Sequence, residues 1–408
     1  MAINVAETTA LRAPAPQSDV TPEELIARAR ALVPALRERA ARAVAERKVP
    51  AETIAEIQAA GLFKILQPRR WGGYEMHPNV FFEAQKILAR GCMSTGWVFG
   101  VVGGHPFELA LFPNAAQVEV WGEDDGTLVS SSYQPVGKVT RVDGGFQLSG
   151  HWGFSSGCEH CDWVLLGAIV PPATPDAAPE ARTFLLPRAD YEIRDAWHVF
   201  GLQGTGSQDV VVEGAFVPEH RTHKSSDGFL CANPGQVENT APIYGLPWAQ
   251  VFLRLVSTAS MGGARAAIDA ALAITRDRVS TNTGKASKAD PLMQNAIARA
   301  EAQLDEIEAV LRRNMDEMVA CVEAGEMVPM EKRNLYRYQS STVPQRCADL
   351  VDALMPLLGG RAIYMTSPIV QPWLDLHAAR AHVANLPSNF GPDLTNGLLG
   401  NPPSFPFL

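Results

Sequence analysis

Apolar residues recur at helical spacing through the first quarter of the chain. Thr21 is predicted to cap a helix that begins at Pro22, with Glu24 completing a capping box. The apolar positions behind this start are Leu25, Leu32, Val33, Leu36, Ala40 and Val44. Further helices are predicted for residues 51–60, 78–90 and 94–112. We therefore expect an N-terminal helical domain over residues 21–126, preceded by a disordered tail over residues 1–20.

The pattern changes from helical to alternating in the middle of the chain. Phe146 and Leu148 alternate with polar neighbours. Runs rich in β-branched and other apolar residues follow at positions 163–170, 183–186 and 210–212, separated by Gly, Pro and Asp. Residues 127–225 are therefore predicted to form a central antiparallel β domain.

Helical spacing returns after about residue 241 and persists. Long segments are predicted at residues 255–275, 291–321, 332–358 and 368–384, which favours a four-helix bundle with a tail over residues 226–408. The order of helices, strands and helices predicts an α+β fold. It excludes a doubly wound α/β sheet, in which strands and helices would alternate.

Composition narrows the class of protein. The 408 residues are 46% hydrophobic and 19% charged, which is typical of a globular chain. The net charge of −9 disfavours a nucleic-acid partner. Since no apolar run is long enough to cross a bilayer and the N-terminus is not a signal peptide, we expect a cytoplasmic protein that does not bind membranes. The 6 cysteines are too few for a disulfide scaffold.

Two serine-rich segments and one histidine are candidates for binding chemistry. Ser131 lies in a Ser-Ser-Ser-Tyr run, and Ser155 and Ser156 follow an aromatic pair that includes Phe154. Such hydroxyls beside aromatic rings could bind a flat heterocycle, although turn serines are equally common. His105 could act as a general base toward a phenol, or could be an ordinary core residue.

Other motifs are weaker. Cys158 and Cys161 have the spacing of a metal or redox pair, but no second ligand pair accompanies them. The Gly-rich segment at residues 201–207 precedes a strand pattern and not a helix, so a connecting loop is favoured over a phosphate loop. His377 and His382 are five residues apart, which is a poor spacing for a helical metal site. No metal is predicted.

Several longer motifs together carry a resemblance to a known family. They are LQPRRWGGYE, STGWVFGVVGGH, EVWGEDDGTLVSSSYQPVGKV, GHWGFSSGCEHCDWVLLG, GLQGTGSQDVVVEGAFVP and WLDLHAARAH. On these motifs, which span nearly the whole chain, it resembles the oxygenase component of two-component flavin-dependent aromatic hydroxylases. This group, which includes 4-hydroxyphenylacetate 3-hydroxylases and 3-hydroxy-9,10-secoandrostatrienedione hydroxylases, belongs to the acyl-CoA dehydrogenase fold superfamily.

The resemblance implies roles for individual residues. Ser156 would bond flavin N5, with Phe154 and Ser155 beside the isoalloxazine. His105 would contact the substrate phenol, and His382, on the C-terminal helix, would lie near flavin C4a. The remaining implied contacts are Trp97 and Ser131 with the flavin and substrate cavity, Tyr244 and Trp248 with the substrate, and Arg278 with flavin phosphates, often across a subunit interface.

The same resemblance implies an activity. Reduced FMN or FAD would come from a separate NAD(P)H:flavin reductase and react with O2 to form a C4a-hydroperoxyflavin, which hydroxylates an aromatic substrate. A homotetramer is expected from the fold family. Because the segment 242–248 is apolar, it favours a hydrophobic, neutral phenol, although indoles and other electron-rich heterocycles stay open.

One departure separates the hydroxylases from their dehydrogenase relatives. Acyl-CoA dehydrogenases abstract a proton with a carboxylate, whose place here falls near Val383, and residues 377–385 contain no acidic side chain. Valine cannot accept a proton, so an acyl-CoA dehydrogenase-like FAD desaturase is disfavoured and stays as an alternative. A non-catalytic assembly protein of the same fold is a second alternative.

Overall fold

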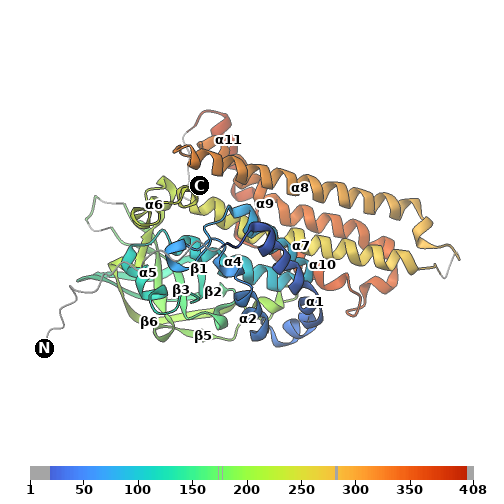
Figure 1. Ribbon diagram of the computed structural model, residues 1–408, viewed down its shortest axis with the longest axis horizontal. Helices are drawn as coiled ribbons and strands as arrows, with labels where there is room; N and C mark the ends of the chain where they lie inside the picture. The colour runs from blue at the N-terminus through green and yellow to red at the C-terminus, as the bar shows by residue number, and fades with distance from the viewer. Residues whose placement is uncertain (1–18, 173, 177, 281–283, 402–408) are drawn as a thin grey trace.

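The computed structural model describes residues 19–172, 174–176, 178–280 and 284–401 (Figure 1). The tail predicted for residues 1–20 lies almost wholly outside these ranges. Helices come first in the chain, a β sheet follows, and long helices come last. In Figure 1 the sheet and the long C-terminal helices lie at opposite ends of the molecule, with α4 between them.

The N-terminal region consists of five helices: α1 (Pro22–Glu46), α2 (Ala51–Ala59), α3 (Pro78–Gly91), α4 (Met93–Leu109) and α5 (Asn114–Trp121). The Thr21 cap is confirmed, because its hydroxyl accepts the backbone N–H of Glu24 at 3.2 Å. The carboxylate of Glu24 bonds Arg28 at 2.5 Å. The helix predicted for residues 94–112 ends at Leu109, and α5 was not predicted at all.

Helix α4 is buried on every side. All of its residues are buried, including His105 and Glu108. Glycines make this possible: a Cβ on Gly96 would collide with Ala89 of α3, and one on Gly104 would collide with Leu255 of α7. The close packing of neighbouring helices holds the polar side chains of α4 in one orientation.

Seven strands form the sheet: β1 (Val129–Val142), β2 (Gly145–Ser155), β3 (Trp163–Val170), β4 (Glu180–Pro187), β5 (Glu192–Arg194), β6 (Gln208–Pro218) and β7 (Thr222–Lys224). Their order is β5-β6-β2-β1-β3-β4-β7. The prediction of a purely antiparallel domain is wrong in one pair, because β1 and β3 are parallel. The chain returns along β2 and then places β3 on the other side of β1, so the two run in the same direction.

The two faces of the sheet bury different clusters. One cluster, centred on Trp152, Phe146 and Phe184, forms the core of the β region. The other packs Leu165 and Leu185 against aromatic and apolar residues of the N-terminal helices: Trp71, Leu109, Phe112 and Trp121. Because Val129 at the start of β1 belongs to this second cluster, β1 is held against the end of α4.

The C-terminal region contains α6 (Ser225–Leu230), α7 (Trp248–Asp277), α8 (Pro291–Glu323), α9 (Met330–Leu354), α10 (Val370–Ala379) and α11 (Gly391–Leu398). Helix α7 packs against α8, α9 and α10, and also against α3 and α4. The helix predicted for residues 368–384 is wrong at its end, because α10 stops at Ala379. None of the helices in the described part of the chain is long and apolar enough to cross a membrane.

Candidate active site

His105 links α4 to β1. Its Nδ1 lies 2.6 Å from the carbonyl oxygen of Val129 and its Nε2 lies 2.9 Å from the hydroxyl of Ser131. A carbonyl can only accept, so Nδ1 carries the proton and Nε2 accepts from Ser131. Burial lowers the pKa of His105 to about 4. The ring is therefore neutral at pH 7, with its acceptor directed to Ser131.

Ser156 lies at the end of a chain of hydroxyl groups. Its Oγ is 2.7 Å from Ser207 Oγ, which is 2.6 Å from Thr205 Oγ1. Thr205 donates to the carbonyl of Leu202 at 2.8 Å, so we assign each remaining hydroxyl proton toward Thr205. Trp97 Nε1 donates to Ser156 at 3.2 Å. Because Ser156 donates to Ser207 and accepts from Trp97, one lone pair of its oxygen remains to accept a hydrogen bond from a ligand.

Thr205 and Ser207 were not singled out from the sequence. They belong to the Gly-rich segment 201–207, which forms a short turn before β6, as a connecting loop would. Asp375 of α10 holds this turn by accepting the backbone N–H of Leu202 at 2.7 Å. The only available signal was the place of these hydroxyls in the motif GLQGTGSQDVVVEGAFVP.

The residues before Ser156 fit one face and edge of a flat ring. Phe154 has a φ of 64°, a left-handed conformation that costs free energy in a residue with a Cβ. Its side chain is 61% exposed and contacts Trp197 edge-on at 5.8 Å. Ser155 is fully buried, and its hydroxyl bonds the Cys158 thiol. An available acceptor and an exposed ring thus lie within three residues.

His382 lies beyond the end of α10, at the start of a turn that spans Val383–Asn385, and not on the helix as predicted. Its Nδ1 accepts the backbone N–H of Ala384 at 3.1 Å, so the proton of the neutral ring is on Nε2. Its ring lies 5.7 Å from Trp97 and 6.4 Å from Phe252. Burial lowers the pKa of His382 to about 4.

A cavity of about 770 Å³ separates the sheet from the C-terminal helices. Its lining, mostly apolar, comes from β1, β3 and β4, from α6 and α7, and from the segments before and within α11. Trp248 and Phe252 of α7 line it, as do Glu108 and Tyr133. Its volume falls in the usual range for small-molecule sites, about 300–1,000 Å³.

Glu108 is a carboxyl group at this cavity that sequence reasoning missed. It lies three residues after His105 on α4, is fully buried, and accepts the hydroxyl of Tyr133. Burial raises the pKa of Glu108 to about 8. The ring of Tyr133 lies 6.4 Å from that of His105 and 5.0 Å from that of Phe252. No sequence motif marked Glu108, since only the contact with β1 shows its surroundings.

Two residues predicted for the site lie elsewhere in the chain. Tyr244 is fully buried in the helical core, where its hydroxyl donates to the carbonyl of Leu66 at 3.1 Å. Arg278 follows the last residue of α7, a helix of 30 residues, and donates to the carbonyl of Leu357 at 2.8 Å. Because Trp248 begins this helix at the cavity, Arg278 lies about 45 Å away along its axis.

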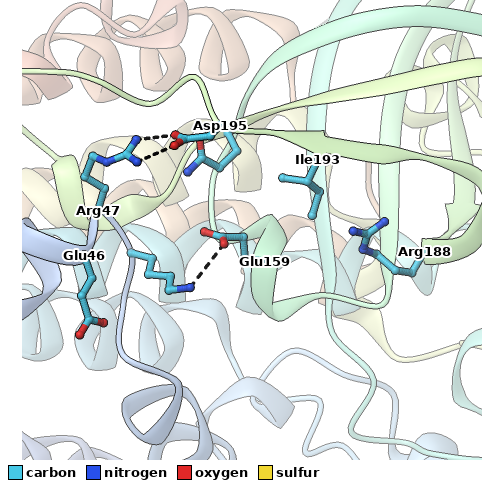
Figure 2. Close-up of a pocket in the computed structure, with 8 residues that line it drawn as sticks. Glu46, Arg47, Glu159, Arg188, Ile193 and Asp195 are labelled. Carbon is cyan, nitrogen blue, oxygen red and sulfur yellow. Dashed lines mark hydrogen bonds and ion pairs between the residues drawn. The ribbon is translucent and has the colours of Figure 1, made fainter.

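A second, polar pocket of about 490 Å³ lies beside the turn that contains Glu159 (Figure 2). Arg47 bonds Asp195 twice, at 2.5 and 2.7 Å, and Lys48 approaches Glu159 at 3.4 Å. These charges are therefore already paired. Burial raises the pKa of the neighbouring Cys158 thiol to about 12, which disfavours the thiolate that a metal requires.

Comparison with known proteins decides the family. The profile described as "Acyl-CoA dehydrogenase, C-terminal domain" matches residues 255–387. The flavin-dependent monooxygenase oxygenase subunit HsaA of Rhodococcus jostii (strain RHA1) is 39% identical over 359 residues, covering 88% of this chain and 93% of that protein. The chain belongs to this family of oxygenase components.

Two further proteins support the assignment of this oxygenase component. The crystal structure of the HsaA monooxygenase from M. tuberculosis superposes with a TM-score of 0.89 at 37% identity, covering 94% of this chain and 100% of that one. The FADH(2)-dependent resorcinol hydroxylase oxygenase component of Rhizobium sp. (strain MTP-10005) is 30% identical over 401 residues, covering 96% of this chain and 98% of that protein. The predicted acyl-CoA dehydrogenase-like fold is confirmed.

The predicted activity class is also confirmed. The oxygenase component is a flavin-dependent monooxygenase that uses reduced flavin and O2 to hydroxylate an aromatic compound. A separate reductase supplies the reduced flavin. Ser156 and Phe154 fit such a cofactor, because together they offer an acceptor and an exposed ring.

Proposed function

We propose that this oxygenase hydroxylates a hydrophobic, neutral phenol that binds in the cavity between the sheet and α7. One observation carries the proposal: a large, mostly apolar cavity reaches Tyr133, whose ring adjoins the hydrogen-bonded pair of His105 and Ser131. Apolar walls favour a bulky ring system, and the paired hydroxyl and imidazole provide a place for one phenolic oxygen. The names of the relatives, which include a resorcinol hydroxylase, agree with a phenolic substrate.

Reduced flavin, when bound, supplies the electrons and the atom at which O2 is activated. We propose that Ser156 accepts a hydrogen bond from the flavin N5–H, since its own hydroxyl donates to Ser207. Trp97 holds that oxygen in place through a hydrogen bond of 3.2 Å. Phe154 would lie beside the isoalloxazine, and Ser155 would contact its edge.

Ser131 and His105 act on the phenol as a unit. Ser131 donates to His105 Nε2, so its oxygen can accept the O–H of a phenol. An imidazole with a pKa of about 4 is too weak a base to hold a phenolic proton. His105 therefore polarises the phenol through Ser131. This role is more limited than that of the general base expected from the sequence.

His382 has the complementary role. Its Nδ1 is occupied by the N–H of Ala384, so its Nε2–H is the group that it can offer. We propose that it donates to an oxygen atom on the flavin side of the cavity. The edge-on contact with Trp97 at 5.7 Å places it on the same side as the Trp97–Ser156 bond.

The fold family also suggests the assembly. We propose three domains, over residues 21–126, 127–225 and 226–408, with α7, α8, α9 and α10 forming a four-helix bundle in a homotetramer. Ile363, Tyr364 and Met365 are 74%, 63% and 70% exposed, which supports a covered apolar surface near Leu357. Arg278, far from its own cavity, would then reach flavin phosphates of another subunit.

The test combines the purified protein with a flavin reductase, NADH, and FMN or FAD under ¹⁸O₂. Hydrophobic phenols should acquire one labelled oxygen and should be turned over in preference to 4-hydroxyphenylacetate. A clear preference for 4-hydroxyphenylacetate would reject the substrate class. Acyl-CoA-dependent reduction of a dye would support the desaturase alternative, and failure to bind reduced flavin would support an assembly role.

A further inference from the structure

Two side-chain pairs bridge α4 and β1 in register. His105 bonds Ser131, and Glu108, three residues later on the helix, bonds Tyr133, two residues later on the strand. Positions three apart on a helix lie on one face, with Cβ atoms about 5–6 Å apart. A hydrogen bond between Ser131 and Tyr133 joins the two pairs, so the carboxyl of Glu108 lies beyond Tyr133 from Ser131.

The second pair is incomplete by itself. Glu108 is fully buried, and Tyr133 occupies its Oε2, but Oε1 has no hydrogen-bond partner among the described residues. Leaving a buried polar atom unpaired costs about 1–3 kcal/mol. Both Glu108 and Tyr133 line the cavity of about 770 Å³, so a ligand there is the available partner.

The protonation state indicates what kind of partner fits. Burial raises the pKa of Glu108 to about 8, so the carboxyl is mostly protonated at pH 7. The Tyr133 hydroxyl donates to Oε2, so the carboxyl proton belongs on Oε1. The unpaired atom is therefore a hydrogen-bond donor that requires an acceptor.

The other charged groups at the cavity are already engaged. Arg182 bonds Glu180 at 2.7 Å and Glu219 at 2.5 Å. Arg337 bonds Asp393 at 2.5 Å. Both arginines therefore have carboxylate partners, whereas the carboxyl of Glu108 keeps one oxygen without a partner among the described residues.

His223, which also lines the cavity, bonds Asn233 at 2.7 Å, and burial lowers its pKa. Burial lowers the pKa of His105 to about 4 and raises that of Tyr133. None of these three side chains changes charge near pH 8. An alkaline change in recognition would therefore report Glu108.

We propose that Glu108, positioned by Tyr133, binds a second neutral oxygen of the substrate, a keto or hydroxyl group carried by the same ring system as the phenolic oxygen. This inference rests on the proposed function, because it takes Ser131 as the site of the phenol. It narrows the substrate class to oxygenated phenols. It also makes Glu108 a specificity-determining residue.

The experiment compares 3- and 4-acetylphenol with 3- and 4-ethylphenol, which replace the carbonyl by a methylene of similar size. Wild-type protein should favour the acetyl member of at least one pair by about tenfold in affinity, the value of one good hydrogen bond. Glu108→Leu should reduce this preference to about one. Glu108→Gln should retain it, because its amide can accept from Tyr133 and donate to the ketone. Exposed Glu306 provides the control variant, Glu306→Gln.

The pH dependence provides a second arm. The wild-type preference, divided by that of Glu108→Gln for the same phenols so that their own ionisation cancels, should decline as the pH rises through about 8, when Glu108 loses its donor proton. A ratio that stays constant over this range would contradict the assigned donor. This arm uses only Glu108→Gln, so it tests the inference even if Glu108→Leu does not fold.

Affinities of the four phenols, measured by calorimetry without turnover, separate this inference from the proposed function. Lack of labelled product from any phenol, with the acetyl preference intact in binding, would reject only the proposed function. Equal affinity for acetyl and ethyl phenols, or an unchanged preference in folded Glu108→Leu, would overturn the inference.

Discussion

His105 and His382 have the same shift in pKa and opposite hydrogen-bonding character. Burial lowers the pKa of each ring to about 4, so both are neutral at pH 7. His105 donates from Nδ1 to the carbonyl of Val129, and its Nε2 accepts from the hydroxyl of Ser131. His382 accepts the N–H of Ala384 at Nδ1 and presents Nε2–H.

The difference comes from the backbone around each ring. His105 lies within a buried helix and faces the start of β1, where a carbonyl is available. His382 lies after the end of α10, at a turn whose first N–H groups need acceptors. In the proposed function, one kind of residue thus provides an acceptor toward the phenol and a donor toward the flavin. For neutral rings, the partner of Nδ1 decides which role Nε2 can have.

The largest effect is expected from removal of the acceptor. In His105→Ala, Ser131 loses its anchor, so product formation should fall by about 100-fold or more while reduced flavin is still oxidised, with release of hydrogen peroxide. The ratio of product to peroxide measures this. Product formation that stays coupled to flavin oxidation would contradict the role of the pair, and Ser131→Ala should show the same uncoupling.

A smaller loss is expected from removal of the donor. His382→Ala deletes one neutral hydrogen bond, worth about 1 kcal/mol, so product yield should fall severalfold to about tenfold. His382→Gln, whose side chain can still donate, should recover part of the loss. If His382→Phe, which keeps an aromatic ring but cannot donate, rescued equally well, the assigned donor role would be wrong.

The comparison also predicts how stability changes between pH 7 and pH 5. A ring with a folded-state pKa of about 4 stabilises the fold fully above pH 6.5, and this contribution is lost as the pH falls toward 4. Glu108 acts in the opposite direction, since its raised pKa makes its contribution full below pH 4.5 and lost as the pH rises through about 8. Acidification should therefore destabilise wild-type protein relative to His382→Asn and stabilise it relative to Glu108→Gln.

Urea unfolding of the three proteins at both pH values measures these differences. Asp375, whose pKa burial raises to about 6, contributes with the same sign as Glu108 and is common to all three. Parallel changes in the free energy of unfolding would show that neither group titrates as its surroundings require.

The smallest effect is expected from a change at Trp97, whose indole contacts both Ser156 and His382. Trp97→Phe removes the hydrogen bond to Ser156 but keeps an aromatic ring beside His382. Affinity for reduced flavin should fall only a few-fold, because a single neutral bond is lost. Anaerobic titration with reduced FMN and FAD measures it. A loss as large as that in Ser156→Ala would mean that the indole binds flavin directly.

Much of the site could be predicted because local sequence carries it. The Thr21 cap, the end of α2 near Gly61 and the strand Trp163–Val170 follow from residues close in the chain. The motifs around His105 and Ser156 carried the family resemblance. Glu108 and Ser207 were missed because their partners, Tyr133 and Ser156, lie 25 and 51 residues away in the chain. Thr205 was missed because it lies in a loop without a pattern.

The sequence by itself determined the order of helices and strands, the family and the reactive residue types, because hydrophobic period and motif spacing are local properties. Only the tertiary structure decided which nitrogen of His105 and of His382 carries the proton, that β3 runs parallel to β1, and that Tyr244 lies in the core. Each of these depends on a backbone or side-chain partner brought close by packing, and no spacing along the chain specifies that partner.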